Sequence, residues 1–468
     1  MAAPDPDRFA AGADARLRFG LLAFLLALSL LLHQIWWDGF ELSGPHFVVV
    51  LAAWAVLLRP TSVGRLVAML AAEVLAVARD MPGAGSHTVL VAVCGAAVLA
   101  YTGWTMRSTR RLPEAGALFE QIAPFLRIGL LVLYAAATLA KLNAGFFDPA
   151  ESCAAALSRQ IAWFDPSLLD GTWRLVPAIW GTVLVEAALP VLLAWPRTRV
   201  AGLAIGTAFH LVLALAGNVP FSALVLALYV AFLPAGVAAR GSVVVLARRP
   251  AWTHGARVGR WARPAALALL VAGWGLGALA ARAAPASAQE AIGYGTRLVV
   301  VVVAAVILAV AVRRRGARRT PEPLGLRPGH PVFVVAIALL VANGMAPYLG
   351  LKTESSFTMF SNLQTEAGYW NHAFIPEAVR VFTYQDQLVT VTASGDPSLL
   401  RRSRFGTRIV RFELERHLRR KNGVRASYRD GSGRVFTAGA ASDGGGVSFL
   451  IDKVAKFRDV RAPGRRGC

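Results

Sequence analysis

The chain has 468 residues, of which 56% are hydrophobic and 16% are charged, and its mean hydropathy is positive at +0.52. Soluble proteins carry about 25% charged residues, so this composition excludes an ordinary soluble enzyme and indicates a membrane protein. The formal net charge of +22 would suggest nucleic-acid binding in a soluble protein. Here most arginines before the polar C-terminal part lie between apolar segments, where arginine orients membrane helices, so we expect no nucleic-acid partner.

Apolar runs follow one another from the N-terminus to about residue 348, and each is long enough to cross a hydrocarbon core of about 30 Å as a helix. We count about eleven candidate membrane helices, with centres near residues 27, 51, 70, 96, 132, 184, 208, 229, 272, 301 and 339. The first run has no small-residue cleavage site after Trp36 and Trp37, so we interpret it as a retained helix and not as a signal peptide. Residues 217–220 (Gly-Asn-Val-Pro) predict a short turn between two helices.

The distribution of arginine predicts how these helices are oriented. With a cytoplasmic N-terminus, the loops on the inner side are arginine-rich, and they hold Arg59 and Arg65, Arg107 with Arg110 and Arg111, Arg197 and Arg199, residues 240–263, and residues 313–327. The loops on the outer side carry few arginines, and they are residues 38–45, 79–86, 143–172, 217–220 and 282–290. This pattern satisfies the positive-inside rule and predicts a protein integral to the cell membrane with an extracytoplasmic C-terminal domain. The long, aromatic-rich loop 143–172 predicts an interfacial or re-entrant helix.

Beyond the last apolar run the sequence is polar, mixed in charge and typical of an α+β domain. VRVFTYQ (379–385) and QLVTVTA (387–393) predict strands. Residues 407–423 predict an amphipathic helix that ends at Gly423, with arginines that form either a solvated face or a contact with anionic lipid or substrate. Residues 424–439 predict a hairpin around Asp430-Gly431.

The predicted fold class is therefore an all-α polytopic membrane protein, with about eleven transmembrane helices in residues 1–348 and a small extracytoplasmic α+β domain in residues 349–468. No metal-ligand spacing, phosphate loop or nucleophile elbow is present in the sequence, so we predict no metal site. Cys94, Cys153 and Cys468 form no framework. A disulfide between Cys153 and Cys468 is one option that their spacing alone does not favour.

Lys141 stands out among the residues of the apolar segments. The chain contains 44 arginines but only five lysines, and Lys141 is the sole lysine before Lys352. An ionisable side chain in the middle of a membrane helix costs about 2.5–3.5 kcal/mol, so each one is a candidate for function. Lys141 either snorkels to the outer interface or acts as a base or nucleophile, because an amine desolvated in an apolar pocket releases its proton near neutral pH and a guanidinium does not.

Three further ionisable residues lie in apolar segments. His210 is either a core group that bonds a neighbouring helix or a functional group, and its position in the outer half of its helix, level with Lys141, favours function. Glu186 precedes Pro190 by four residues, so its carboxylate either bonds backbone near a kink or pairs with a cation in the bundle. For Glu73 we expect an interhelical hydrogen bond.

Several short motifs, taken in chain order, resemble one known family. They are Lys-Leu-Asn at 141–143, the aromatic loop that follows, Glu186-x-x-x-Pro190-x-Leu-Leu, Arg197-Thr198-Arg199, Phe209-His210, Phe221-Ser222, Tyr229, and SSFTMFSNLQTEAGYWNH at 355–372. Over about residues 15–372 the chain resembles the vitamin K-dependent gamma-carboxylase-like proteins, also called the HTTM-domain family, and in particular their bacterial members. The preference for arginine over lysine is typical of a GC-rich bacterial genome.

The resemblance implies a membrane enzyme that oxidises a reduced quinone with O2 and uses the base so formed to remove a proton from a peptide glutamate before it adds CO2. It implies that Lys141 deprotonates the quinol and that His210 orients the quinone or its oxyanion. Further quinone-binding residues are then Phe209, Glu186, Asn218 and His372. Asn218 lies eight residues after His210, whereas in the animal enzyme an asparagine follows the histidine closely.

The expected cofactor is a reduced, vitamin K-like quinone, and the expected partners are membrane lipid or quinone and an extracytoplasmic protein or peptide. Only about 120 residues follow the last apolar segment, so we expect quinone use more strongly than protein carboxylation. The alternative function is that of a non-catalytic membrane carrier or assembly protein that binds a lipid or a protein partner.

Overall fold

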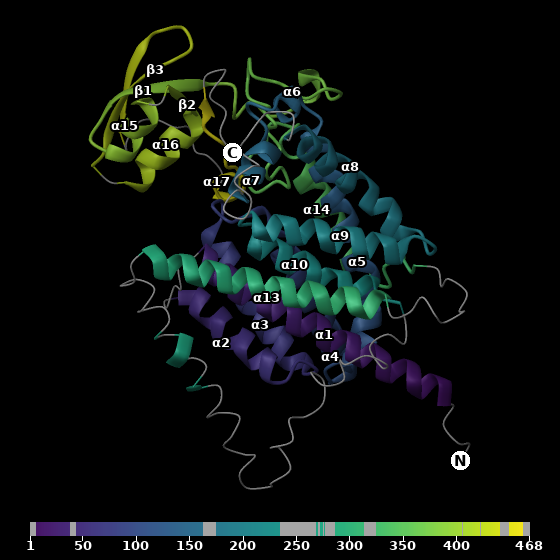
Figure 1. Cartoon of the computed structure of the whole chain (residues 1–468). Coiled ribbons are helices and arrows are strands. Elements are labelled where there is room, and N and C mark those ends of the chain that lie inside the picture. Colours follow the sequence, from purple (N-terminus) through teal and green to yellow (C-terminus); the bar gives the residue numbers. More distant parts are fainter. Residues whose placement is uncertain are drawn as a thin grey trace. The chain divides into compact units, whose positions relative to one another are not determined.

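The computed structural model of the chain describes residues 6–37, 44–161, 175–234, 268–269, 272–274, 276, 286–312, 324–404, 406–421, 423–439 and 449–461 (Figure 1). Helices make up most of these residues, and a small sheet lies near the C-terminal end. Several sequence predictions fall outside the described residues, and these are most of loop 38–45, residues 162–172, the arginine segment 240–263, residues 282–285 of loop 282–290, most of 313–327, and Cys468.

Helices occupy the expected centres wherever those residues are described, except that only isolated residues are described around residue 272. They are α1 (Pro6–Trp36), α2 (Gly44–Leu58), α3 (Val63–Asp80), α4 (Ser86–Thr109), α5 (Ala115–Lys141), α6 (Ala144–Phe147), α7 (Cys153–Gln160), α8 (Leu175–Ala194), α9 (Arg199–Leu215), α10 (Val219–Tyr229), α13 (Ala286–Val312) and α14 (Pro331–Met345). Among the described residues, four helices are long and apolar enough to cross a membrane, and these are Gly12–Trp36 within α1, α4, α5 and α8. This supports the membrane class but not the count of about eleven spans.

The remaining apolar stretches within the described residues are shorter than the four candidates, including one inside the 27-residue helix α13. Helix α3 is different in character. The shorter ones are Gly44–Leu58, Arg199–Leu215, Val219–Phe232, Ile292–Ala305 and Pro331–Met345. Helix α3 carries four charged residues, and its buried positions recur at helical spacing along one side. An amphipathic pattern of this kind is typical of a helix with one packed face, so α3 is not among the candidate spans.

The chain divides into two compact units. The first comprises Met1–Arg79, Leu90–Leu131 and Ala187–Leu339, and the second comprises Asp80–Val89, Val132–Glu186 and Leu340–Cys468. The boundaries fall inside α4, α5, α8 and α14 and at the last residue of α3, so this division follows contacts and not the expected border between membrane and outer domain at residue 348. That border stays a prediction.

The first unit is built from apolar helices that pack along one another: α1 contacts α2 and α10, and α9 contacts α10 and α13 (Figure 1). Trp36 Nε1 donates to Thr296 Oγ1 at 2.9 Å and ties the end of α1 to α13. The predicted break at residues 217–220 is confirmed, because α9 ends at Leu215 and α10 begins at Val219. In lipid every backbone polar group must be satisfied within the protein, which helices achieve internally.

The sheet belongs to the second unit and consists of β1 (Leu388–Ser394), β2 (Thr407–Val410), β3 (Arg425–Arg429), β4 (Val435–Gly439) and β5 (Val460–Arg461). It is antiparallel with the order β4-β3-β1-β2-β5. Helices α15 (Pro397–Arg404) and α16 (Arg411–Arg420) lie beside it (Figure 1). The core beneath them contains Val389, Val391, Leu399, Ile409, Leu414, Leu418, Ala426, Tyr428 and Ala438. A small C-terminal α+β part is therefore present, and the 387–393 strand and the 424–439 hairpin are confirmed.

The predicted strand at 379–385 is wrong. Glu377–Val379 forms a 3-10 turn, and no strand follows it before β1. The amides of Val381 and Phe382 both donate to the carbonyl of Leu349, at 3.1 and 2.9 Å, so they are not available to a neighbouring strand. This stretch of alternating apolar residues therefore bonds to the loop after α14 and not to the sheet.

The predicted helix at 407–423 is also wrong over its first four residues. Val410 and Ile409 pair with Leu388 and Val389 of β1, so residues 407–410 form β2 and the helix begins only at Arg411. The β-branched residues of this stretch suit a strand, and a partner strand decides the outcome. In the predicted outer loop 143–172, the described part holds the two short helices α6 and α7.

Candidate functional site

The strongest candidate site is a buried ion pair between α5 and α8. Lys141 is the last residue of α5, and its Nζ lies 2.8 Å from Oε2 of Glu186 on α8. The two side chains are 5% and 8% exposed. Lys141 Nζ also donates to the carbonyl of Ala137 at 3.4 Å and lies 5.9 Å from the ring centre of Phe146. Of the two interpretations of Glu186, pairing with a cation is the one that the structure shows.

Burial of this ion pair is costly in free energy. Each charge loses its hydration when it is buried, and only the partner offsets that loss, so removal of one partner from a buried pair costs about 3–5 kcal/mol. Snorkelling is not supported, because the ammonium of Lys141 is directed at a carboxylate within the protein. Within the described residues Glu186 Oε2 accepts no aligned hydrogen bond, so this oxygen retains acceptor capacity beside the ammonium.

Asn143 fixes the chain directly after Lys141. Its side chain is fully buried, and Nδ2 donates to the carbonyls of Ala140 at 2.8 Å and Ser361 at 2.6 Å. Its Oδ1 accepts from the amide of Phe146 at 2.9 Å and from Nδ2 of Asn371 at 3.3 Å. One side chain therefore ends α5, begins α6 and attaches the 355–372 segment, which are the regions that carry the family resemblance.

His372, in the 355–372 segment, also bonds to the C-terminal end of α5. Its Nδ1 accepts from the amides of Phe374 at 3.1 Å and Ile375 at 2.8 Å, so the proton resides on Nε2, which donates to the carbonyl of Leu139 at 2.9 Å. Burial lowers the pKa of His372, and the bond to the Leu139 carbonyl opposes this shift. The ring also packs against Tyr348 with centroids 5.2 Å apart. His372 is thus a neutral cap of α5, and its proposed contact with quinone stays a prediction.

The 355–362 part of the segment has an unusual backbone. Ser355, Phe357, Phe360 and Asn362 all have φ between 50° and 60°, a left-handed conformation that non-glycine residues rarely adopt. The surrounding bonds hold this shape: Asn362 Oδ1 accepts from the amide of Cys153 at 2.7 Å, and its Nδ2 donates to the carbonyl of Glu151 at 2.8 Å. Such strain persists where the surrounding structure over-determines it, and it is concentrated at functional sites.

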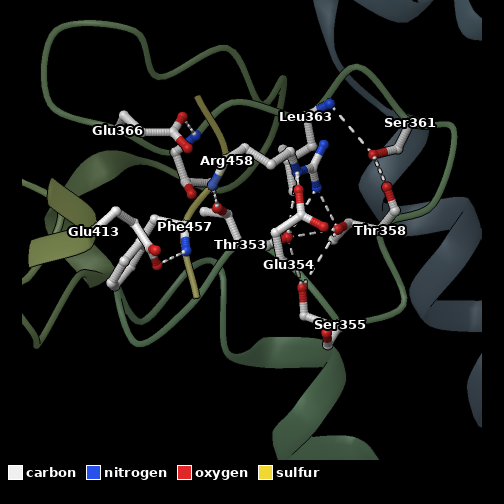
Figure 2. A network of polar contacts seen from close by, with 12 residues as sticks. Thr353, Glu354, Ser355, Thr358, Ser361, Leu363, Glu366, Glu413, Phe457 and Arg458 are labelled. Atoms are coloured by element: carbon white, nitrogen blue, oxygen red, sulfur yellow. Dashed lines mark hydrogen bonds and ion pairs between the residues drawn. The ribbon is translucent and has the colours of Figure 1, made fainter. Parts of the chain in front are cut away.

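A polar network anchors the same segment to the sheet (Figure 2). Arg458, next to β5, donates to the carbonyl of Thr353 from Nη2 at 3.0 Å and to the hydroxyl of Thr358. Burial raises the pKa of Glu366, while the charge of Arg458 and hydrogen bonds from the backbone and from Thr353 oppose this shift. The network therefore couples the left-handed loop to the α+β part of the unit.

The other predicted residues belong to the first unit, whereas Lys141, Glu186 and His372 belong to the second. His210 on α9 is fully buried, and its ring packs against Phe209, Phe221 and Tyr229 with centroids 5.4, 5.4 and 6.1 Å apart. Asn218 precedes α10 without a side-chain cap, and its carbonyl accepts from the amide of Ser222 at 3.1 Å. Glu73 is buried on α3.

Sequence reasoning missed Asn143, Asn362 and Tyr348 as site residues. Asn143 lies within the Lys-Leu-Asn motif. The sequence feature that indicates its role is a short amide side chain directly after an apolar helix, which is typical of a cap. Tyr348 is 1% exposed, and its hydroxyl has no hydrogen-bond partner among the described residues. A tyrosine after a helix carries no such signal in the sequence.

The cysteines and possible metal ligands complete the description. Cys153 is disulfide-bonded, Cys94 is a buried free thiol, and Cys468 lies outside the described residues. Across the described ranges, no group of three or more His, Cys, Asp or Glu side chains is arranged to hold a metal ion.

Comparisons with known proteins give no match: no protein-family model, no curated protein and no solved structure matches this chain.

Proposed function

We propose that this chain is a membrane enzyme of the quinol- and O2-dependent oxygenase or carboxylase-like type, as its resemblance to the vitamin K-dependent gamma-carboxylase-like proteins implies. The observation that carries the proposal is the buried contact of 2.8 Å between Lys141 and Glu186. An ionisable pair in an apolar helical environment is costly and marks a functional site by default. The two motifs of the resemblance also meet in one place, since Asn143 bonds Ser361 and His372 bonds Leu139.

The pairing suggests how the two residues share the work. In this ion pair the ammonium of Lys141 has no lone pair and the carboxylate of Glu186 has free ones, so Glu186 and not Lys141 can accept a proton. One proton moves from a substrate hydroxyl to Oε2 of Glu186, and the ammonium of Lys141 stabilises the oxyanion that remains. The total charge of the site is the same before and after this transfer. The resemblance assigns the base role to Lys141, and this proposal shifts it to Glu186.

Buried polar atoms near the pair suit a ligand with hydroxyl or carbonyl oxygens. Thr138 Oγ1 and the Tyr348 hydroxyl have no hydrogen-bond partner among the described residues. Thr138 lies about one turn before Lys141 on α5, and Tyr348 packs in one cluster with Ala140. When bound, a reduced quinone supplies the electrons for reaction with O2. The residues of the chain bind its oxygens and hold the proton.

The proposed location is the cell membrane, with a cytoplasmic N-terminus, about eleven spans and an extracytoplasmic C-terminal domain. The four long apolar helices and the placement of arginine support it. The disulfide of Cys153 agrees with an outer position for the second unit, because disulfides persist in oxidising compartments.

Substitutions of the pair test the proposal. We expect E186Q to lower the rate of O2 consumption with a reduced naphthoquinone by at least about 100-fold, because it removes the proton acceptor. K141R keeps a cation and should cost less, about tenfold, since the larger guanidinium displaces the oxyanion. K421R is the matched control, because Lys421 is also paired with a carboxylate, Asp396, at 2.6 Å, but lies in the α+β part.

The outcomes separate the candidate roles. Complete loss in K141R with activity left in E186Q would return the base role to Lys141. Absence of turnover in the wild type with every quinol tested overturns the enzyme proposal. Mass spectrometry of lipids and quinones that co-purify in mild detergent then distinguishes the second class of function, because a carrier retains a lipid without converting it.

A further inference from the structure

Two of the five lysines of the chain, Lys453 and Lys456, approach one turn of the second unit, and a third, Lys352, is linked to that turn through Ser355. We call these three residues the lysine cluster. The turn consists of residues 81–85 between α3 and α4. Lys453 Nζ donates to the carbonyl of Met81 at 3.4 Å. Lys456 Nζ lies 3.9 Å from the position that a Cβ on Gly83 would take. Both side chains therefore approach the turn from the C-terminal end of the chain.

Lys352 reaches the same turn through Ser355. Its Nζ donates to the carbonyl of Ser355 at 3.2 Å, and the hydroxyl of Ser355 donates to the carbonyl of Ala84. Lys352 is 3% exposed, and burial lowers its pKa to about 8. The left-handed backbone at Ser355 thus holds a buried ammonium beside the turn.

Among the described residues, no carboxylate lies within ion-pair distance of Lys352, Lys453 or Lys456. Several other cations of the same unit, although not all of them, have acidic partners, and these are Lys141, Arg380, Arg402, Arg411, Arg416, Arg419, Arg420, Lys421 and Arg458. Hydrogen bonds to backbone carbonyls do not neutralise a buried or half-buried positive charge, so an anion from outside the chain would stabilise this place.

Two features of the turn indicate which anion fits. It leads directly into α4, whose first amides at residues 86–88 are the positive end of a long helix dipole. Helix α4 is also one of the four helices apolar enough to cross a membrane, so the proposed topology places its N-terminus at the level of the outer lipid headgroups. Three compact ammonium groups exceed the single charge of a carboxylate and match a phosphate group, which carries up to two charges and accepts several hydrogen bonds.

We infer that the lysine cluster and the N-terminus of α4 form a phosphate-binding site whose occupant is the phosphate of an anionic lipid headgroup. The site lies apart from the Lys141–Glu186 pair in function and does not depend on the proposed enzyme activity. Lysine suits these three positions better than arginine would. Its ammonium is a compact point charge that can lie close to packed backbone carbonyls.

Lipid retention by the full chain tests this inference. Protein purified in mild detergent is stripped of lipid and incubated with equal amounts of phosphatidic acid and diacylglycerol, which differ only in the phosphate. Native mass spectrometry then counts the bound lipids. We expect the wild type to retain phosphatidic acid at least about tenfold over diacylglycerol, and K352Q/K453Q/K456Q to lose this preference.

Two control variants separate a loss of lipid binding from a change in net charge and from a loss of folding. R401Q/R408Q/R429Q removes the same formal charge from exposed arginines of the same unit and should bind like the wild type. K453Q/K456Q leaves Lys352 in place and changes only half-buried side chains, so it stays folded if the triple variant does not, and it should weaken retention partly. Thermal stabilisation by inorganic phosphate without phosphatidic acid retention assigns the same site to a soluble phosphate. Equal retention by wild type and K453Q/K456Q, or no response to either probe, overturns the inference.

Discussion

Two buried lysines of the second unit differ in the groups that their ammonium contacts. Lys141 ends an apolar helix and has a carboxylate partner at 2.8 Å, whereas Lys352 follows an apolar helix and, among the described residues, donates to a backbone carbonyl at 3.2 Å with no carboxylate partner. Both are nearly inaccessible, at 4% and 3% exposure. The difference is that one ammonium is neutralised by a carboxylate of the chain and the other lies beside a backbone carbonyl. Our proposals of proton transfer at the first region and anion binding at the second depend on this difference.

Removal of the internal counter-ion should produce the largest effect. We expect E186A to destabilise the protein by about 3–5 kcal/mol, because the ammonium of Lys141 then remains buried without a partner. K141M/E186L replaces both charges with apolar side chains and should recover most of that stability without activity. Thermal unfolding in detergent, followed by size-exclusion chromatography, measures both variants. Equal stability of E186A and the wild type would show that Lys141 is not held by its partner and would remove the contrast with Lys352.

The frame around Lys141 should contribute the next largest effect. N143A leaves the carbonyls of Ala140 and Ser361 and the amide of Phe146 without their side-chain partner, and we expect a loss of about 2–3 kcal/mol. N362A is the comparison, because Asn362 is only partly buried and bonds the loop at Cys153 and Glu151. Hydrogen exchange at the end of α5 reports the result. A smaller loss in N143A than in N362A contradicts the role of Asn143 as the central cap.

Lys352 should give the smallest effect, and it should depend on pH. Its folded-state pKa of about 8 lies below its ordinary value of 10.5, so the unfolded chain binds more protons between these values. The stability of lipid-free protein should therefore rise as pH increases from about 8 to about 10.5, and below about 8 the full cost of the buried ammonium remains.

The K352M variant isolates this contribution. It removes the ammonium, so its unfolding temperature should lack the rise that Lys352 adds, while K421M should keep it. Phosphatidic acid should also abolish the rise in the wild type, because a bound phosphate holds Lys352 in the charged form. A rise of the same size in K352M and wild type would show that other groups cause it.

The amount of structure that could be predicted differs along the chain. Apolar runs predicted α1, α4, α5 and α8, because length and hydropathy are properties of the sequence itself. The hairpin β3–β4 was predicted from its turn residues. The strand predicted at 379–385 and the helix start predicted at 407 were wrong, because the first stretch bonds to Leu349 and the second pairs with β1. Both outcomes depend on partners that are distant in the sequence.

The same division applies to the site. The scarcity of lysine and the cost of a charge in hydrocarbon were enough to single out Lys141 and Glu186, since both are local properties. Only the tertiary structure decided that these two side chains pair, that Asn143 joins the two motif regions, and that Lys352, Lys453 and Lys456 surround one turn. Sequence determines which groups are expensive to bury, and the packing of distant segments determines which partner offsets that cost.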